Sequence, residues 1–350
     1  MRNWPTGMLS GLRSLAMAGN GDPGGGGSGG RVRLLVVVLV VQLVVAVALI
    51  VFVIAGWPWI DRAPASPARA AAVPERFLPG APDDSVPTPT ADRFDSAYAF
   101  SLLRRQVERY GWRPAGSAAL RRLAVDLKGR LPGGRLESLG PRHPRLRNVT
   151  GVIPGRRPAI LVAAHYDVEA RPRGFVGAND GAAGTAAVVG IARALAALPV
   201  PGGREVRFAL FDGEEEPAGS ADHYRDGLRG SRAYLRRHRG EVGGLVLLDY
   251  VGARGLRLPR EGSSNRELWA RLRAAAGRVG VTEAFPDETG ATVYDDHTPF
   301  LLAGVPAINL IDWGYPWRDT LADDMTKVSP RSLDVAGEAV VELVDELRRR

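Results

Sequence analysis

The sequence predicts an α/β fold: a mostly parallel mixed sheet with helices on both faces, preceded by one transmembrane helix. Two observations predict the folded part: short apolar runs of strand length alternate with longer helical stretches, and most helical stretches separate two strands. Parallel neighbours need such crossover connections, and strands covered on both faces are apolar throughout. A third observation, a long uncharged run near the start of the chain, predicts the membrane helix.

The first 33 residues are rich in glycine and weakly basic, a composition that predicts a disordered tail over 1–33. From Leu34 to Trp57 no residue is charged, and a helix of that length spans the roughly 30 Å hydrocarbon layer. We therefore expect a transmembrane anchor over 34–60, with Trp57 and Trp59 at the interface. A cleaved signal peptide is the alternative, although the run exceeds the usual apolar length. The basic bias of the tail predicts a single-pass protein of the cell membrane whose folded domain is extracytoplasmic.

A segment rich in proline and alanine follows at 61–92 and predicts a semi-extended tether. The folded domain is expected to occupy 93–350. Its first helix should begin at a cap formed by Asp95 or Ser96, and its second at Ser117. Strands are predicted at 149–153, 160–164, 206–211, 245–248 and 307–311. Further helices are predicted at 182–198, 228–237, 266–279 and 331–347.

The chain carries 46 lysines and arginines against 38 acidic residues, a net charge of +8. The basic residues are nearly all arginine and are scattered, apart from the tail 348–350, so they do not predict a nucleic-acid surface. The chain contains no cysteine, which excludes disulfides, thiol catalysis and thiolate ligands. A metal ion would therefore be held by imidazole and carboxylate groups.

Acidic residues and histidines follow the predicted strands where the apolar runs end. They are His165, Asp167, Asp180, Glu214, Glu215, Glu216, Asp249, Asp295, Asp296 and His297. Loops that leave the carboxyl ends of parallel strands converge at one edge of the sheet, so we expect these side chains to lie together there. Imidazole and carboxylate groups are ligands that zinc accepts, and the pattern therefore predicts a metal site.

The surroundings of three of these acids predict separate tasks. Asp180 opens a helix among small residues that let the backbone approach closely, so its carboxylate is placed to bridge two cations. Glu214 and Glu215 are adjacent and point in different directions, so that one can bind metal while the other serves as a base.

Seven short motifs run through the folded domain in a fixed order. They are Ala164-His165-Tyr166-Asp167, Gly177-Ala178-Asn179-Asp180, Phe211-Asp212-Gly213-Glu214-Glu215, Gly230-Ser231-Arg232, Leu247-Leu248-Asp249, Asp295-Asp296-His297-Thr298-Pro299-Phe300 and Gly304-Val305-Pro306. In this order the chain resembles the zinc aminopeptidase and glutaminyl cyclase family, metallopeptidase family twenty-eight of the MH clan. The resemblance extends from about Arg113 to the C-terminus. It implies a zinc exopeptidase-like fold, of the phosphorylase/hydrolase-like kind.

The resemblance also implies roles for single residues. His165, Asp180, Glu215 and Asp249 would bind one or two zinc ions per chain, with Asp180 as the bridge. Glu214 would be the general base. Asp167 would orient His165, as a metal-bound imidazole usually requires.

Further residues are expected around these ligands. Asp295, Asp296 and His297 would support the ligands rather than bind metal. Trp313 and Trp317 could wall the substrate pocket or be buried in packing.

This chain departs from the family's pattern at the position of the last metal ligand. The family has a histidine in a His-Thr-x-x-Asp pattern, and this sequence has Asp319 at that place. If Asp319 is a ligand, its negative charge should weaken the Lewis acidity of the metal. The alternatives are that the site binds metal poorly and that Asp319 forms a salt bridge with Arg318. His223 is the spare imidazole near the site and a second candidate for the missing ligand.

Three functions follow from the resemblance. The first is a membrane-anchored zinc aminopeptidase, in which metal-activated water attacks the first peptide bond and Glu214 takes its proton. The second is a glutaminyl-peptide cyclotransferase, which forms N-terminal pyroglutamate and releases ammonia. The long segment between Glu215 and Gly230 favours the cyclase, whereas Asn179 and Asn309 argue against it. The third is a catalytically degenerate binding ectodomain. Peptide or protein N-termini are the expected partners of the first two.

Overall fold

The computed structural model describes residues 42, 44, 73–77, 85–220 and 222–350. The predicted tail 1–33, nearly all of the predicted anchor 34–60 and much of the predicted tether 61–92 lie outside these residues, as do Trp57 and Trp59. Within the part described, no helix has both the length and the apolar character needed to cross a membrane. The chain divides into two units, Met1–Ala71 and Ala72–Arg350, and everything below concerns the second.

In the described residues, six strands form one mixed sheet in the order β1-β2-β4-β3-β5-β6. The last four strands along the chain run parallel to one another, whereas β2 is antiparallel to both β4 and β1. The mostly parallel mixed sheet that the sequence predicts is confirmed. The strands are β1 Arg135–Ser138, β2 Arg147–Ile153, β3 Arg156–His165, β4 Arg204–Phe211, β5 Val242–Asp249 and β6 Ala307–Ile311.

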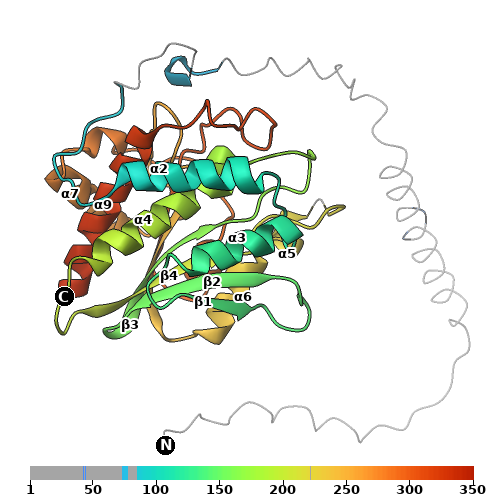
Figure 1. Cartoon of the computed structure of the whole chain (residues 1–350), viewed down its shortest axis with the longest axis horizontal. Coiled ribbons are helices and arrows are strands. Elements are labelled where there is room, and N and C mark those ends of the chain that lie inside the picture. Colours follow the sequence, from blue (N-terminus) through green and yellow to red (C-terminus); the bar gives the residue numbers. More distant parts are fainter. Residues whose placement is uncertain (1–41, 43, 45–72, 78–84, 221) are drawn as a thin grey trace, which may run out of the picture. The chain divides into compact units, whose positions relative to one another are not determined.

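Helices cover both faces of the sheet. Figure 1 shows α2, α4 and α9 in one layer across the sheet, and their buried side chains join the larger hydrophobic core together with those of α3 and α7. On the opposite face, Tyr234 of α6 and Phe300 of α8 pack against Phe211 of β4. The helices are α2 Ser96–Arg105, α3 Ala118–Lys128, α4 Gly184–Ala196, α5 His223–Asp226, α6 Arg229–Arg237, α7 Arg266–Arg278, α8 Thr298–Leu302 and α9 Pro330–Arg349; shorter helical turns lie at Glu75–Phe77, Gln106–Tyr110, Ala178–Ala183 and Thr282–Ala284.

The third strand shows why the sheet is covered on both sides. Ile160 and Val162 of β3 belong to one core cluster, whereas Leu161 and Ala163 belong to the other, as the alternation of a strand requires. Full burial of each larger side chain contributes about 1.5–3 kcal/mol. The apolar run therefore fixes β3 inside the sheet and brings His165 to its carboxyl end.

The two predicted caps begin their helices where expected. The side chain of Asp95 accepts a hydrogen bond of 2.8 Å from the backbone N–H of Tyr98, and that of Ser117 accepts one of 3.1 Å from Leu120. Each satisfies a backbone donor that the first helical turn leaves free.

Strand β1 and helix α5 are among the elements that were not predicted from the sequence. Strand β1 is a largely exposed, partly charged edge strand without an apolar run, and α5 is a single turn with no buried residue. Both lack the buried apolar periodicity on which the prediction depends. The predicted helix 182–198 is regular only from Gly184, because an irregular turn precedes it.

Part of the predicted tether packs against the domain. Both terminal nitrogens of Arg76 donate to the carboxylate of Asp312, at 2.7 and 2.8 Å. Phe77 is buried, with its ring edge-on to those of Tyr315 and Trp317 at centroid distances of 6.0 and 5.5 Å. Residues 75–77 therefore contact the loop that follows β6.

Candidate metal centre

The candidate site lies at the carboxyl ends of the parallel strands. His165 is the last residue of β3, and Asp249 is the last of β5. Glu214 and Glu215 come shortly after the end of β4, and Asp180 lies in the turn before α4. All five are buried. The fold therefore brings these residues to one sheet edge, as the sequence predicts.

The turn that carries Asp180 is not helical. Asp180 has φ −85° and ψ 109°, and Gly181 has a positive φ of 79°. A Cβ at Gly181 would lie 2.5 Å from the carbonyl oxygen of Asp167, so glycine is required there. The carboxylate of Asp323 accepts hydrogen bonds from the backbone N–H groups of Asn179 and Asp180, at 2.9 and 3.0 Å. These contacts hold Asp180 at the strand ends.

His165, Asp180 and Asp249 form a compact group of possible ligands. Nε2 of His165 lies 3.2 Å from Oδ1 of Asp180 and 3.4 Å from Oδ1 of Asp249. The three ligand atoms all lie within 4.8 Å of one another. The other ring nitrogen of His165 is buried without a hydrogen-bond partner. One imidazole and two carboxylates make a donor set that zinc accepts, so these residues fit the predicted metal.

The charges around this group favour a bound cation. Burial lowers the pKa of His165, but the carboxylates of Asp167, Asp180 and Asp249 outweigh burial and raise that pKa well above its usual value. Burial and the charge of Asp180 raise the pKa of Glu215 well above its usual range. Buried carboxylates that repel one another are stabilised by a divalent cation between them.

Asp167 holds the loop after β4. Its two carboxylate oxygens accept hydrogen bonds of 3.3 Å from the backbone N–H groups of Glu214 and Glu215. Its Oδ1 lies 3.8 Å from Nδ1 of His165, which is too long for a hydrogen bond. The orienting role expected for Asp167 stays a prediction, and the structure adds the support of the glutamate loop.

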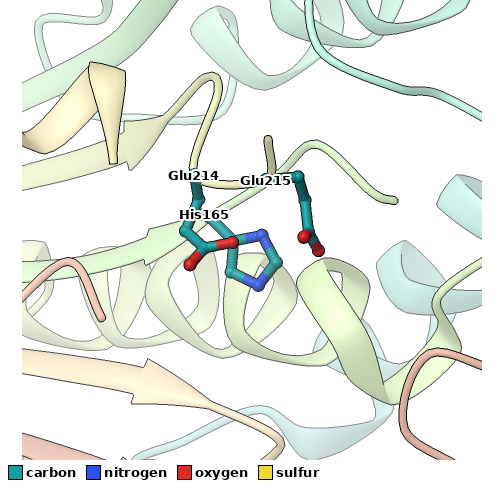
Figure 2. A group of neighbouring side chains, drawn as sticks. All are labelled: His165, Glu214 and Glu215. Carbon is teal, nitrogen blue, oxygen red and sulfur yellow. The ribbon is translucent and has the colours of Figure 1, made fainter. Parts of the chain in front are cut away.

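Glu214 and Glu215 direct their carboxylates to different sides of the His165 imidazole (Figure 2). The carboxylate of Glu214 lies 3.3 Å from Nε2 of His223, whose Nδ1 lies 3.1 Å from Glu216. Burial lowers the pKa of His223, but these two glutamates outweigh it and raise the pKa to about 10. At that pKa His223 carries a positive charge at neutral pH and contacts the expected base Glu214, and its role as a substitute ligand stays a prediction.

Asp319 is linked to Asp180 by the hydroxyl group of Tyr250. The hydroxyl of Tyr250 donates to Oδ2 of Asp180 at 2.8 Å and to Oδ1 of Asp319 at 3.4 Å. Arg318, the alternative partner of Asp319, instead lies 3.7 Å over the ring of Trp313. Burial, together with the charge of Asp180, raises the pKa of Asp319. Asp319 and Asp180 therefore share the Tyr250 hydroxyl as a hydrogen-bond partner, but no group of possible metal ligands found among the described residues includes Asp319.

Asp295, Asp296 and His297, which were expected to support the ligands, lie in different surroundings in the structure. Asp295 lines the cavity and accepts a 2.6 Å hydrogen bond from the side chain of Asn309. Asp296 is buried, and burial raises its pKa well above the usual value. His297 lies away from the ligands, with Nε2 3.1 Å from Glu261 and 2.9 Å from the hydroxyl of Ser263.

Replacing Glu261 by glutamine should lower the free energy of unfolding by roughly 3 kcal/mol at pH 7. Burial alone would raise the pKa of Glu261, but its hydrogen bonds with His297 and Ser263 bring it down to about 2. A depressed carboxyl pKa stabilises the fold above the usual value of 4.5 and loses this effect as the pH falls towards 2. Urea unfolding at pH 7 and pH 3.5 measures the difference from the wild type.

We expect this difference to fall by about half at pH 3.5. The exposed Glu267→Gln variant on α7 is the control and should match the wild type. An equal difference at both pH values would show that Glu261 stabilises the fold by packing rather than by charge.

The ligands line a cavity of about 360 Å³. Tyr224, Tyr294 and Trp313 form an aromatic part of its wall, and the rings of the two tyrosines lie 4.2 Å apart. Trp313 thus occupies the expected place. Trp317 does not line this cavity, because its ring packs against Phe77 and Tyr315.

Sequence reasoning missed the wall residues Tyr224 and Tyr294, and also two residues beside the predicted ligands. Glu169 lines the cavity next to Glu215 and Glu216. One carboxylate oxygen from each of these three glutamates lies within 4.8 Å of the other two. Burial and the negative charges nearby raise the pKa of Glu169 to about 7. Tyr250 is the second. Each follows a predicted ligand by one to a few residues, which was the available signal.

Comparison with known sequences identifies similar proteins. Residues 148–344 match the sequence profile of peptidase family M28. Aminopeptidase YwaD of Bacillus subtilis is 33% identical over 201 residues, which are 53% of this chain and 40% of that protein. The chain therefore spans less than half the length of this relative. A glutaminyl-peptide cyclotransferase of Gloydius blomhoffii is 26% identical over 276 residues, 65% of this chain and 74% of that protein.

Solved structures of similar proteins align with the same part of the chain. A glutaminyl cyclase from an Acidobacteriales bacterium aligns with a TM-score of 0.64 and 26% identity. The alignment covers 75% of this chain and 97% of that one. The likeness therefore extends over the domain that carries the cavity.

Proposed function

Because this chain belongs to peptidase family M28, we propose that its domain is a zinc-dependent enzyme acting on the N-termini of peptides, and that it is an aminopeptidase. One observation carries the proposal: Glu214 lies within 4.8 Å of the ligand atoms of His165 and Glu215, yet its carboxylate contacts the cationic His223. A carboxylate beside the ligands and paired with a positive charge suits a general base. The membrane anchor at 34–60 and the extracytoplasmic domain are part of the same proposal, on the sequence alone.

The residues of the site divide the work of peptide hydrolysis. His165, Asp180 and Asp249 would hold a divalent cation, whose positive charge would serve to polarise the scissile carbonyl. Glu214 accepts a proton from the attacking water and delivers it to the departing amine. The carboxyl groups of Glu169 and Glu216 line the cavity and offer oxygens that suit the ammonium group of a peptide N-terminus.

The cavity sets the size of what can bind. About 360 Å³ lies at the lower end of small-molecule sites and suits one terminal residue with its peptide bond. The aromatic wall of Tyr224, Tyr294 and Trp313 offers apolar contact to the side chain of that residue.

Glutaminyl-peptide cyclisation is the second candidate. The structural likeness to a glutaminyl cyclase over 97% of that chain favours it. In this reaction the α-amine of the substrate attacks its own glutamine side chain, and Glu214 passes a proton to the departing ammonia. No water is consumed. The third expectation, a degenerate binding domain, is not supported, because the relatives above are named as enzymes and Glu214 lies in place beside the ligands.

Product analysis separates the two reactions. Two peptides that differ only in their first residue, glutamine or leucine, are incubated with the zinc-loaded protein and followed by mass spectrometry. We expect both peptides to lose one free amino acid, and a chelator to stop the reaction. Loss of ammonia from the glutamine peptide alone would instead establish the cyclase. No change in either peptide after zinc reconstitution would refute the proposed function.

A further inference from the structure

Residues Glu75–Phe77, which we call the strap, contact the loop that follows β6. This loop extends from 312 to 329, between the end of β6 and the start of α9. Within the described part of the chain it contains no helix and no strand of the sheet. Such a loop is ordered mainly by the contacts of its side chains, so these contacts decide where its residues lie.

Arg76 contacts both chain neighbours of the cavity residue Trp313. Its terminal nitrogens donate to the carboxylate of Asp312, a side chain that is only 1% exposed. On the other side of Trp313, a Cβ at Gly314 would lie 2.9 Å from Nη2 of Arg76, so the guanidinium group lies close to the backbone there. Nη1 of Arg76 also donates to the carbonyl oxygen of Gly255 at 2.8 Å. Arg76 therefore holds the chain on both sides of Trp313.

Phe77 links the strap to the turn that carries a predicted metal ligand. Its buried ring packs edge-on against Tyr315, whose hydroxyl donates to Oδ1 of Asp323 at 2.6 Å. Asp323 in turn accepts hydrogen bonds from the backbone N–H groups of Asn179 and Asp180. The strap thus contacts the neighbours of a cavity wall residue directly and reaches the turn of Asp180 through two side chains.

A binding wall that is already held in place costs the substrate no ordering free energy, whereas a wall that must be ordered on binding lowers affinity. We propose that Arg76 and Phe77 are positioning residues: they hold the loop 312–323 so that Trp313 stays at the cavity, and they thereby set the affinity for a large apolar first residue. This inference rests on the proposed function, since it concerns how a peptide N-terminus binds. The strap lies outside residues 148–344, which carry the family match.

Steady-state kinetics on the full zinc-loaded chain test the effect on the substrate. Two peptides that differ only in their first residue, leucine or alanine, are compared. In Arg76→Ala, KM for the leucine peptide should rise about 3–10-fold, as expected when one more side chain must be ordered on binding. The value of kcat, and KM for the alanine peptide, should change by less than about twofold, because the alanine side chain makes little contact with the wall. Phe77→Ala should act in the same direction, since it loosens the same loop.

Hydrogen exchange tests the position of the loop without reference to activity. The backbone amides of 312–323 should exchange faster in Arg76→Ala and in Phe77→Ala than in the wild type, whereas those of β3 and β5 should not change. Arg76→Lys keeps the charge and can still donate to Asp312, but it lacks the paired donors of arginine. It should therefore recover part of the KM and part of the slow exchange.

An ion pair away from the cavity provides the matched control. Arg278 of α7 pairs with Glu342 and Glu346 of α9, so Arg278→Ala should keep the wild-type KM and the wild-type exchange of 312–323. An equal rise of KM in Arg278→Ala would show that Arg76 acts through overall stability and would overturn the inference. Unchanged exchange of the loop in both strap variants, or an equal rise of KM for both peptides, would overturn it as well.

Failure of the strap and failure of the proposed function give different results. A wild type that cleaves both peptides, with a KM that the strap variants leave unchanged, would refute the role of the strap alone. A wild type that cleaves neither peptide would refute the proposed aminopeptidase, and the exchange measurement would still decide whether the strap holds the loop.

Discussion

Replacing Glu214 by glutamine should lower kcat/KM by about 10²–10⁴-fold, the range of a general base, without changing the metal content. Glutamine has nearly the same shape and can still contact His223, but its amide cannot accept a proton from water at neutral pH. The metal should stay, because His165, Asp180 and Asp249 form a ligand group that does not include Glu214. Steady-state kinetics and elemental analysis on the same preparation measure both quantities.

A matched surface variant checks that the change at Glu214 acts locally. Glu288 is exposed and pairs with Arg257, so Glu288→Gln should have wild-type kinetics. Activity within threefold of the wild type in Glu214→Gln would show that another group takes the proton. Loss of metal together with activity would show that Glu214 is a ligand.

Replacing Asp180 by asparagine should remove the metal and reduce activity to background. Oδ1 of Asp180 lies 3.2 Å from Nε2 of His165, and its Oδ2 accepts a 2.8 Å hydrogen bond from the hydroxyl of Tyr250. Without the charge of Asp180, the group of His165, Asp180 and Asp249 keeps a single carboxylate, which is too little to hold a divalent ion. Elemental analysis and the melting temperature with and without zinc measure the effect.

Zinc should change the melting temperature of the wild type but not that of the variant. Zinc should raise the melting temperature of the wild type and leave that of Asp180→Asn unchanged, because only a bound ligand stabilises the fold by mass action. The metal-free variant should melt at or above the metal-free wild type, because one repelling carboxylate of a buried cluster is gone. A variant that still gains stability from zinc would contradict the bridging position of Asp180.

Most of the sheet could be predicted because its strands are buried on both faces. The run that forms β3 has no polar residue between Ala159 and Ala164, and burial of such a run in the sheet places His165 at the carboxyl end. The same argument places Asp249 after β5. The site residues that follow buried strands were therefore accessible from the sequence pattern.

The remaining parts depend on contacts that local sequence does not encode. The non-helical turn at Asp180 needs the distant carboxylate of Asp323. His223 meets Glu214 only because a loop without buried apolar residues folds back over the site. Arg76 and Phe77 lie in a proline-rich segment, yet they contact Asp312 and the rings of the following loop. Hydrophobic periodicity carries no signal for such polar and long-range contacts.

Glu169 and Tyr250 show the same limit of prediction from local sequence. Glu169 follows His165 closely in sequence, but its contact with Glu215 depends on how two loops meet. Tyr250 directly follows Asp249, and its link between Asp180 and Asp319 depends on its unusual backbone angle. Sequence motifs predicted the ligands, whereas the structure shows the contacts that join these residues.

The proposed function depends on a zinc ion bound where β3 and β5 end. X-ray diffraction from zinc-loaded crystals, collected on both sides of the zinc absorption edge, locates that ion without reference to activity. We predict an anomalous peak within bonding distance of Nε2 of His165 and the carboxylates of Asp180 and Asp249. The proposed zinc position would be contradicted if the zinc-loaded protein showed no peak there, or showed its strongest peak among Glu169, Glu215 and Glu216.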